Sequence, residues 1–443
     1  MSTNKQHLIE AAKSILAKND RGDWTMPTSN GLYPHQWLWD TFFISMGQRH
    51  YDVKRAKQEV RSPFRAQWKN GMLPHIIFGK AKGYHAGPEM WCSEVSRQAP
   101  DHISTTGITQ TPLAAEATVR IGAFLNAKER REWYKEMYPK IVAYHQWFYR
   151  ERDPRGDGLI ITVHPWENGM DNSPPQMEML HKYAISKRLR LVKNLGLENF
   201  LKRFRKDTAV VPAEERISTL DLYAVYTLIQ KLRRVKYDHA KILQSHPFQI
   251  IDLMLSCVLI RANEHLKMMA DEIGETLPAD IKKAMRVAPH ALETLWDDET
   301  EQYYNRDAIS GKLIKESSLL TFLPLYGLQL PKDRVEKLVA HLHNPDTFGA
   351  PYPVPSTPLN SSYFKPHCYW QGPSWMPTNW LVIQGLLHNG QKAEAHRISE
   401  ATIAMVQKGG FHEYFSPIDM SKAGADTFSW TAALAIDLIK SDI

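Results

Sequence analysis

Apolar residues recur at helical spacing along much of the chain. The clearest case is 247–270, where they fall three or four residues apart at Ile251, Leu255, Val258, Ala262, Leu266 and Met269. Such spacing places apolar side chains on one face of an α-helix. Further helices are predicted over 1–19, 127–150, 220–232, 391–407 and 428–439. No long stretch alternates apolar and polar residues as a strand would, although 295–315 predicts one small hairpin. We therefore expect an all-α protein.

The loops between these helices are rich in aromatic and polar side chains. Of thirteen tryptophans, at least eight lie in or beside loops: Trp37, Trp39, Trp91, Trp166, Trp370, Trp375, Trp380 and Trp430. Tryptophans that only filled a core would lie within the periodic helices, so this distribution favours a ligand pit lined with indoles. A toroid of helical hairpins would gather one set of loops around such a pit. No repeat or composition break divides the chain, so we predict a single domain over 1–443.

The loop 166–174, with the sequence WENGMDNSP, is the richest in candidate chemistry. Gly169 would let the backbone approach a ligand closely, and Trp166 offers a flat face to a sugar ring. Asp171 is the candidate proton donor. The alternative is an ordinary turn, because Asp, Asn and Ser side chains often bond to their own backbone.

A second candidate carboxyl group belongs to Glu413, in the loop 409–417. One acid and one base are the minimum for hydrolysing a glycoside, and Asp171 and Glu413 each lie in an aromatic loop near a glycine. They form the predicted catalytic pair. Other acidic residues in similar surroundings remain alternatives: Asp40, Glu89, Glu94 and Glu167. For Asp40, a further alternative is capping of the helix that continues to Met46.

Composition narrows the class of protein. The 443 residues are 43% hydrophobic, enough for a large core, and the net charge is +7. Residues 181–206 hold nine Lys and Arg and one acid, so the rest of the chain is close to neutral. This local run favours a solvated helix face over a nucleic-acid surface. Three scattered cysteines, and the absence of a signal peptide or membrane-spanning run, predict a soluble cytoplasmic protein.

Several common catalytic motifs are missing from the sequence. There is no GxSxG, HExxH, P-loop or GxGxxG pattern. We therefore expect no serine nucleophile of the hydrolase type, no metal and no nucleotide cofactor. The expected partner is a small-molecule glycoside, with neither nucleic acid nor membrane, and a homo-oligomer is left open.

Six motifs, in order, resemble glycoside hydrolase family sixty-three, and in particular its compact bacterial mannosylglycerate and glucosylglycerate hydrolases. They lie at 31–40, 70–75, 107–112, 166–174, 369–375 and 410–417. The resemblance implies an (α/α)6 toroid of six helical hairpins and an inverting mechanism. It also implies that Asp171 is the general acid, that Glu413 is the general base, and that Asp40 holds the sugar at the cleavage subsite.

The same resemblance implies a set of sugar-binding side chains. Those matching the family's motifs are Tyr33, Trp37, His75, Gln110, Trp166, Gly169, Trp370 and Trp375. Their neighbours in the aromatic loops complete the predicted substrate-binding set: Gln36, Trp39, Tyr84, Tyr369 and Gln371.

Residues 175–218, which we call the cover segment, resemble the part of the glycerate-type enzymes that folds over the acid half of the substrate. Arg205 is the better candidate to bind a substrate carboxylate, and Arg216 is the second. Alternatively, Arg205 is paired with Asp207 or Glu215 in a structural loop.

The predicted function is an inverting α-glycosidase acting on a small anionic glycoside such as mannosylglycerate or glucosylglycerate. Gln371 stands where many relatives carry Arg, so the sequence does not identify the group that is attached to the sugar. The alternatives are an α-glucosidase acting on a neutral disaccharide, a sugar epimerase or isomerase on the same toroid, and a carbohydrate-binding protein without catalysis.

Overall fold

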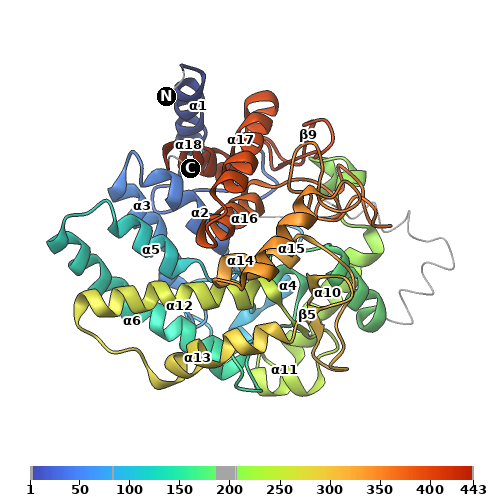
Figure 1. Ribbon diagram of the computed structural model, residues 1–443. Helices are drawn as coiled ribbons and strands as arrows, with labels where there is room; N and C mark the ends of the chain where they lie inside the picture. The colour runs from blue at the N-terminus through green and yellow to red at the C-terminus, as the bar shows by residue number, and fades with distance from the viewer. Residues whose placement is uncertain (1–2, 82–83, 186–204, 206, 442–443) are drawn as a thin grey trace.

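The computed structural model describes residues 3–81, 84–185, 205 and 207–441 (Figure 1). Within these residues, six helices form a closed inner ring, in which each packs against the next and the last packs against the first. In ring order they are α2 (Leu38–Gln48), α5 (Ala114–Gly122), α12 (Leu253–Ile273), α14 (Leu323–Gly327), α16 (Met376–His388) and α18 (Ser429–Lys440).

Six further helices of the described chain alternate with the inner ones along the sequence. They are α1 (Thr3–Asn19), α3 (Val53–Arg61), α6 (Ala127–Glu151), α13 (Ala279–Glu293), α15 (Lys332–His343) and α17 (Lys392–Gly409). Of these, α1 packs against α18, α3 against α2, α6 against α5 and α12, α13 against α12, and α17 against α16. This arrangement is an (α/α)6 toroid of helical hairpins, so the predicted fold class is confirmed.

Burial differs between the two layers. Every residue of α2 is buried, as is every residue of α18 from Ser429 to Ile439. The outer helices bury one face, as α13 does with Ile281, Ala284, Ala288 and Leu292. A helix enclosed by protein needs no polar face. The inner helices α2 and α16 therefore lack the clear amphipathic period that marks helices in the sequence.

Short antiparallel strand pairs tie the loops together. β1 (Gln36–Trp37) pairs with β2 (Ile76–Ile77), β5 (Trp296–Asp297) with β6 (Gln302–Tyr303), β8 (Tyr414–Phe415) with β9 (Lys422–Ala423), and β4 (Ile250–Ile251) with both β3 (Ile161–Thr162) and β7 (Arg306–Asp307). Within 295–315, β5 and β6 pair across a turn at 298–301, and a single bridge between Arg306 and Leu313 spans Ser310 and Gly311, around which the hairpin was predicted. The β1–β2 and β8–β9 pairs lie next to His75 and Glu413, so they fix the ends of two loops that carry candidate site residues.

The remaining helical segments lie among the loops. They are η1 (Ser62–Ala66), α4 (Pro88–Trp91), η2 (Ser93–Val95), η3 (Pro165–Glu167), α7 (Pro174–Met179), η4 (Leu180–Ala184), η5 (Asp207–Ala209), η6 (Ala213–Glu215), α10 (Thr219–Arg234), α11 (His239–Ser245) and η7 (Leu319–Phe322). No helix in the described part of the chain is long and apolar enough to span a membrane.

Two expectations about local structure are corrected. Helix α12 begins at Leu253 rather than at residue 247, because Asp252 caps it by accepting a hydrogen bond from the backbone N–H of Leu255 (3.0 Å). Asp40 does not cap α2, because Trp37 occupies the N-cap position and Asp40 lies within the first turn. The Asp40 side chain is therefore not used to end the helix.

A buried carboxylate on α18 joins three segments where the ring closes. Asp437 is fully buried and accepts bonds from Arg49 Nη2 (2.7 Å), His50 Nε2 (2.8 Å) and Trp380 Nε1 (2.8 Å). Arg49 and His50 follow α2, and Trp380 belongs to α16. Burial by itself would raise the pKa of Asp437, but Arg49 and His50 hold it below its ordinary value. This carboxylate therefore joins the first, fifth and sixth inner helices.

Replacing this carboxylate should weaken ring closure. Asp437→Asn leaves the Arg49 guanidinium buried without its counter-charge, so the free energy of unfolding should fall by about 3–5 kcal/mol. Urea denaturation followed by circular dichroism measures the change. The matched control is Glu10→Gln on the outer face of α1, whose ion pair with Lys13 is exposed and should matter little. An Asp437 variant as stable as this control would contradict the assignment.

Candidate active site

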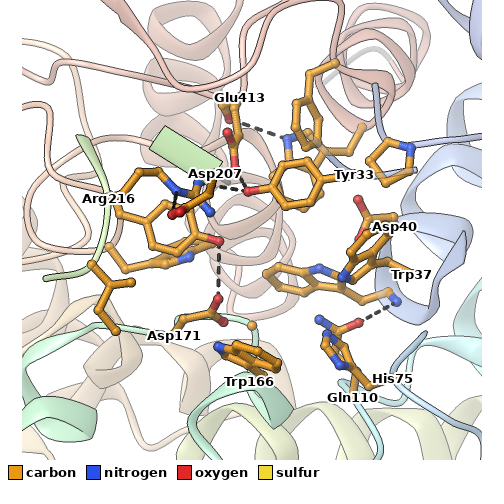
Figure 2. Close-up of a pocket in the computed structure, with 18 of the residues that line it drawn as sticks. Tyr33, Trp37, Asp40, His75, Gln110, Trp166, Asp171, Asp207, Arg216 and Glu413 are labelled. Atoms are coloured by element: carbon orange, nitrogen blue, oxygen red, sulfur yellow. Dashed lines mark hydrogen bonds and ion pairs between the residues drawn. The ribbon is translucent and has the colours of Figure 1, made fainter. Parts of the chain in front are cut away.

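A pocket opens among the loops, and we call it the pit (Figure 2). Its lining includes both predicted catalytic residues, Asp171 and Glu413, whose carboxyl groups face it from distant parts of the chain. Predicted substrate-binding residues that line it are Tyr33, Trp37, Trp39, Asp40, His75, Tyr84, Gln110, Trp166, Gly169, Arg216, Tyr369 and Trp370. The structure thus brings together residues from most of the six motifs.

The loop 166–174, which we call the acid loop, rests on a buried ion pair. Arg152 donates to both oxygens of Glu167, at 2.8 and 2.7 Å, and both side chains are fully buried. The backbone N–H of Val163 also donates to Glu167 (2.7 Å), and Arg152 donates to the carbonyl of Ile161 (3.1 Å). Glu167, an alternative catalytic acid in the sequence, is therefore occupied in holding the loop.

Two amides anchor the acid loop on either side of Asp171. Asn168 donates to the carboxylate of Asp252 (2.9 Å), the residue that caps α12. Asn172 accepts from the backbone N–H of Trp370 (2.9 Å). The loop is therefore attached to an inner helix at one end and to the 369–375 loop at the other.

Gly169 is the one position of this loop where no side chain fits. Its φ is +80°, a backbone conformation that favours glycine, and an added Cβ would lie 2.5 Å from the indole of Trp39. The backbone at Gly169 was expected to approach a ligand closely. In the structure it packs closely against the indole of Trp39, which lines the pit.

Asp171 lies at the edge of the pit with part of its surface open to it. Burial raises the pKa of its carboxyl group to about 7, against a lowering influence of Arg216. The hydroxyl of Tyr369 donates to Oδ2 of Asp171 (3.2 Å). The residue therefore holds a proton near neutral pH, which suits a proton donor.

Glu413 is almost completely buried, and both of its carboxylate oxygens are held. The hydroxyl of Tyr33 donates to Oε1 (2.7 Å), and the backbone N–H of Ala425 donates to Oε2 (2.9 Å). Burial raises the pKa of Glu413, and Arg216 opposes that effect. These bonds fix the orientation of the carboxylate relative to the pit.

Arg216 is the cation of the pit, between the two candidate catalytic carboxyls. Nη1 donates to the hydroxyl of Tyr33 (2.9 Å) and lies 3.7 Å from Oε1 of Glu413. The guanidinium group also lies over the ring of Tyr369, 4.2 Å from its centroid. Among its nitrogens, Nε is buried without a hydrogen-bond partner.

Asp40 brings a third carboxyl group to the pit. It lies in the first turn of α2 and is buried, and burial raises its pKa well above the ordinary value, with Glu413 and Asp171 adding to the effect. The backbone N–H of the preceding residue, Trp39, donates to Oε1 of Gln110 (3.1 Å), which orients that amide at the same wall.

Aromatic rings form much of the pit wall. Trp370 stacks on Trp375 with ring centroids 3.7 Å apart and planes 6° from parallel. Trp39 meets Trp430 edge to face, with centroids 5.6 Å apart. Flat, rigid indole faces pack well against the apolar faces of sugar rings.

Four predicted substrate-binding residues do not line the pit. Trp375 lies behind Trp370 and supports it. The Gln36 amide donates to the hydroxyls of Thr41 and Ser62 and accepts a hydrogen bond from Arg65. Gln371 donates to the carbonyl of Asn172 (3.0 Å).

Arg205 is the fourth residue outside the pit. It is paired with Asp207, which was the alternative to substrate binding considered from the sequence. It makes two bonds to Asp207, at 3.1 and 2.6 Å, and lines a neighbouring pocket instead of the pit. The expected order of the two arginines is therefore corrected, because Arg216 is the one that faces the pit.

The pit also contains residues that the sequence did not single out as site residues. They are Pro27, His85, Asp207, Ile217, Leu222, Phe428 and Trp430. Trp430 carried a usable signal, because it is an indole at the start of a helix beside a motif. For Asp207 the sequence showed no signal of a site residue except that it lies near two arginines.

The sequence predicted that the protein holds no metal. In the described ranges, no three His, Cys, Asp or Glu side chains are grouped so that they could hold a metal ion. The polar groups that line the pit are its carboxyls, the amide of Gln110, the imidazoles of His75 and His85, the tyrosine hydroxyls and the guanidinium group of Arg216.

Comparison with known proteins places the chain in a family. A sequence profile described as "Mannosylglycerate hydrolase MGH1-like glycoside hydrolase domain" matches residues 33–431. The chain belongs to this glycoside hydrolase family. The predicted resemblance to glycoside hydrolase family sixty-three is confirmed, and so is the assignment as an enzyme that hydrolyses glycosidic bonds.

Members of the family align with nearly the whole chain. Mannosylglycerate hydrolase of Thermus thermophilus is 35% identical over 430 residues, covering 96% of this chain and 99% of that protein. Glucosylglycerate hydrolase of Mycolicibacterium hassiacum is 30% identical over 451 residues, covering 97% of each. A crystal structure of a family sixty-three mannosylglycerate hydrolase from Thermus thermophilus, in complex with Tris and D-glycerate, superposes with a TM-score of 0.87 at 34% identity, covering 97% and 99% of the two chains.

The raised pKa of Asp171 predicts how its ionisation acts on stability. In the unfolded chain the carboxyl titrates near 3.8, and in the folded protein near 7. The folded state therefore loses stability as pH rises through this window. Asp171→Asn cannot ionise, so its melting temperature should exceed that of the parent at pH 8 by more than at pH 5.

A second carboxyl supplies a control of opposite sign. Burial opposes ionisation of Asp307, but hydrogen bonds from Ser310, Tyr183 and Lys182 lower its pKa to about 2. Asp307→Asn should therefore destabilise the protein more at pH 8 than at pH 3. If Asp171→Asn showed the same trend as Asp307→Asn in calorimetry, the carboxyl of Asp171 would not hold its proton in the folded state.

Proposed function

We propose that this protein hydrolyses the α-glycosidic bond of a small anionic glycoside, mannosylglycerate or glucosylglycerate, with inversion at the anomeric carbon. The observation that carries the proposal is the pit itself, where a protonated Asp171, a fixed Glu413 and the cation of Arg216 share one aromatic-walled space. Support also comes from the relatives, which are named hydrolases of these two glycosides, and from the solved relative, which holds D-glycerate.

Asp171 would act as the general acid. Its proton would pass to the glycosidic oxygen as the bond to the anomeric carbon breaks, which makes the glycerate a neutral hydroxyl leaving group. Tyr369 donates to one oxygen of Asp171, so the acidic proton is directed to the other oxygen. This arrangement suits transfer to a substrate lying in the pit.

Glu413 would act as the general base. In an inverting reaction it takes a proton from the water that attacks the opposite face of the sugar. The two bonds from Tyr33 and Ala425 hold the carboxylate in one orientation, so little reorganisation is needed when water is activated.

Asp40, Gln110 and the indoles would bind the sugar ring. Buried carboxyls and amides make hydrogen bonds to sugar hydroxyls, and the faces of Trp370 and Trp39 can pack against carbon-bound hydrogens. His75 would serve as a neutral hydrogen-bonding partner, because burial lowers its pKa to about 3.

The cover segment would close one side of the pit. Its described part contributes Arg216 to the pit lining and is attached to the base hairpin, β8–β9, through Glu215. Gly424 N–H donates to the Glu215 carboxylate and the Tyr414 hydroxyl to the Glu215 carbonyl, each at 2.8 Å. The basic run within 186–204 lies outside the described residues. We propose one catalytic domain over 1–443, with 175–218 as this cover.

The three cysteines, Cys92, Cys257 and Cys368, are free thiols in the structure. Free thiols persist in reducing compartments, which supports a cytoplasmic location for the enzyme.

The proposed function is tested by following hydrolysis with proton NMR. Mannosylglycerate and glucosylglycerate, both α-linked, should be cleaved, with the β-anomer of the sugar released first. Asp171→Asn and Glu413→Gln should each lower kcat by about 10²–10⁴-fold. The parent's kcat/KM should fall as pH rises through about 7, where Asp171 loses its proton.

The matched control is Asp419→Asn, a carboxylate at the tip of the β8–β9 hairpin that is exposed and outside the pit lining. Its activity should equal that of the parent. Release of the α-anomer first would show a retaining reaction, and near-parent activity of either catalytic variant would remove that residue from its role.

Arg216 should bind the substrate carboxylate. A charge-assisted hydrogen bond contributes about 1.5–3 kcal/mol, or roughly ten- to a hundredfold in affinity. Arg216→Gln should therefore raise KM for glycosylglycerates by this factor, and steady-state kinetics measures it. Hydrolysis of a neutral methyl α-glycoside should be slow in the parent and change much less. Equal losses on both substrates would mean that Arg216 acts through the catalytic carboxyls or the loop and does not bind the substrate carboxylate.

A further inference from the structure

Asp207 lines the pit, yet it matches none of the six motifs and the proposed reaction gives it no step. It is 3% exposed and accepts two hydrogen bonds from Arg205. Arg205 is itself fixed, because it donates to the carbonyl of Ile217 (2.7 Å) and to the hydroxyl of Thr219 (3.3 Å) at the start of α10. The carboxylate of Asp207 is therefore held firmly in position.

This fixed carboxylate lies on one side of Arg216, and Glu413 lies near its other end. The distance from Arg216 Nε to Asp207 Oδ2 is 3.7 Å, and the distance from Nη1 to Glu413 Oε1 is also 3.7 Å. Neither is a hydrogen bond. Nη1 donates to Tyr33 instead, and Nε keeps its proton without a partner.

Two carboxylates at equal distances attract the guanidinium group in different directions. A buried arginine beside a single carboxylate normally forms direct, often bidentate, hydrogen bonds with it. Arg216 makes no such pair with either acid, although both are within reach. The group remains available to the pit because neither neighbour captures it.

We propose that the Arg205–Asp207 pair is a positioning device that keeps Arg216 from forming a direct ion pair with Glu413. Glu413 then remains free to accept a proton from water, and the guanidinium group of Arg216 keeps its place in the pit lining. This inference rests on the proposed role of Glu413. Asp207 suits the task because, although burial opposes its ionisation, Arg205 and Arg216 lower its pKa to about 2, so it is charged throughout the neutral range.

Other ionisable groups also face Glu413 and set the background for a pH experiment. They are Tyr33, Asp40, Asp171, Glu215, Arg216, Tyr369 and Tyr414. None of these residues is substituted in an Asp207 variant, so a shift in the acidic limb of activity can be assigned to movement of Arg216 and loss of the Asp207 charge.

The first test is the pH dependence of kcat/KM on mannosylglycerate or glucosylglycerate, whichever the parent cleaves. In Asp207→Asn, Arg216 should pair with Glu413, so the acidic limb should move to lower pH by about 1 or more. The weakened base should lower kcat by about tenfold or more at the optimum. Asp207→Glu keeps the charge and should restore much of the parent profile.

A double-mutant cycle separates positioning from a structural role. Once Arg216→Gln has removed the guanidinium group, adding Asp207→Asn should have little further effect on the acidic limb. Asp221→Asn is the matched control, because that carboxylate lies in the first turn of α10, bonded to Ser218 and His181, and outside the pit lining. An unmoved acidic limb in Asp207→Asn, or additive effects in the cycle, would overturn the proposal even if the melting temperature fell.

Binding of D-glycerate, measured by titration calorimetry, requires no turnover. Capture of Arg216 by Glu413 in Asp207→Asn should weaken this binding by about tenfold. Tighter binding would overturn the proposal, because Asp207 would then act only by repelling the ligand. This measurement stays informative even if Glu413→Gln proves active, an outcome that defeats the proposed function itself.

Discussion

The site depends on the ion pair between Arg152 and Glu167, which has no exposure to solvent. An unpaired charge at that depth would be very costly, so each partner requires the other. The pair links the end of α6 to the acid loop, and the Arg152 contact with Ile161 extends it to the β3–β4–β7 strands. A loop without regular secondary structure is in this way fixed to the scaffold, and Asp171 inherits its position.

The rest of the pit is organised by similar buried polar contacts between loops. Asp252 both caps α12 and holds Asn168, so one carboxylate sets a helix end and a site loop. Asn172 and Trp370 join the acid loop to the aromatic wall. Part of the preorganisation in this enzyme therefore comes from side chains that do not touch the pit, as a precise catalytic geometry usually requires.

Local signals predicted the helices and the aromatic loops, and the family resemblance implied the six-hairpin toroid and most of the pit residues. Amphipathic outer helices have a period, and site loops combine indoles, amides and acids. The start of α12 was missed because an apolar strand, Ile250–Ile251, runs directly into an apolar helix. Arg205 was ranked above Arg216 as the candidate to bind a carboxylate, since both lie in one irregular segment whose sequence does not show which of them faces the pit. Only the fold shows that Asp207 engages Arg205 and leaves Arg216 facing the pit.

The bond between Tyr33 and Glu413 joins residues 380 positions apart. It is possible only because α18 packs against both α1 and α2, which brings the two ends of the chain side by side (Figure 1). During synthesis on the ribosome, Tyr33, Trp37 and Asp40 emerge long before Glu413 and Trp430. A nascent chain can therefore fold much of its helical scaffold but cannot possess a complete pit. Packing of α18 against α1 and α2 is therefore a condition for catalytic competence.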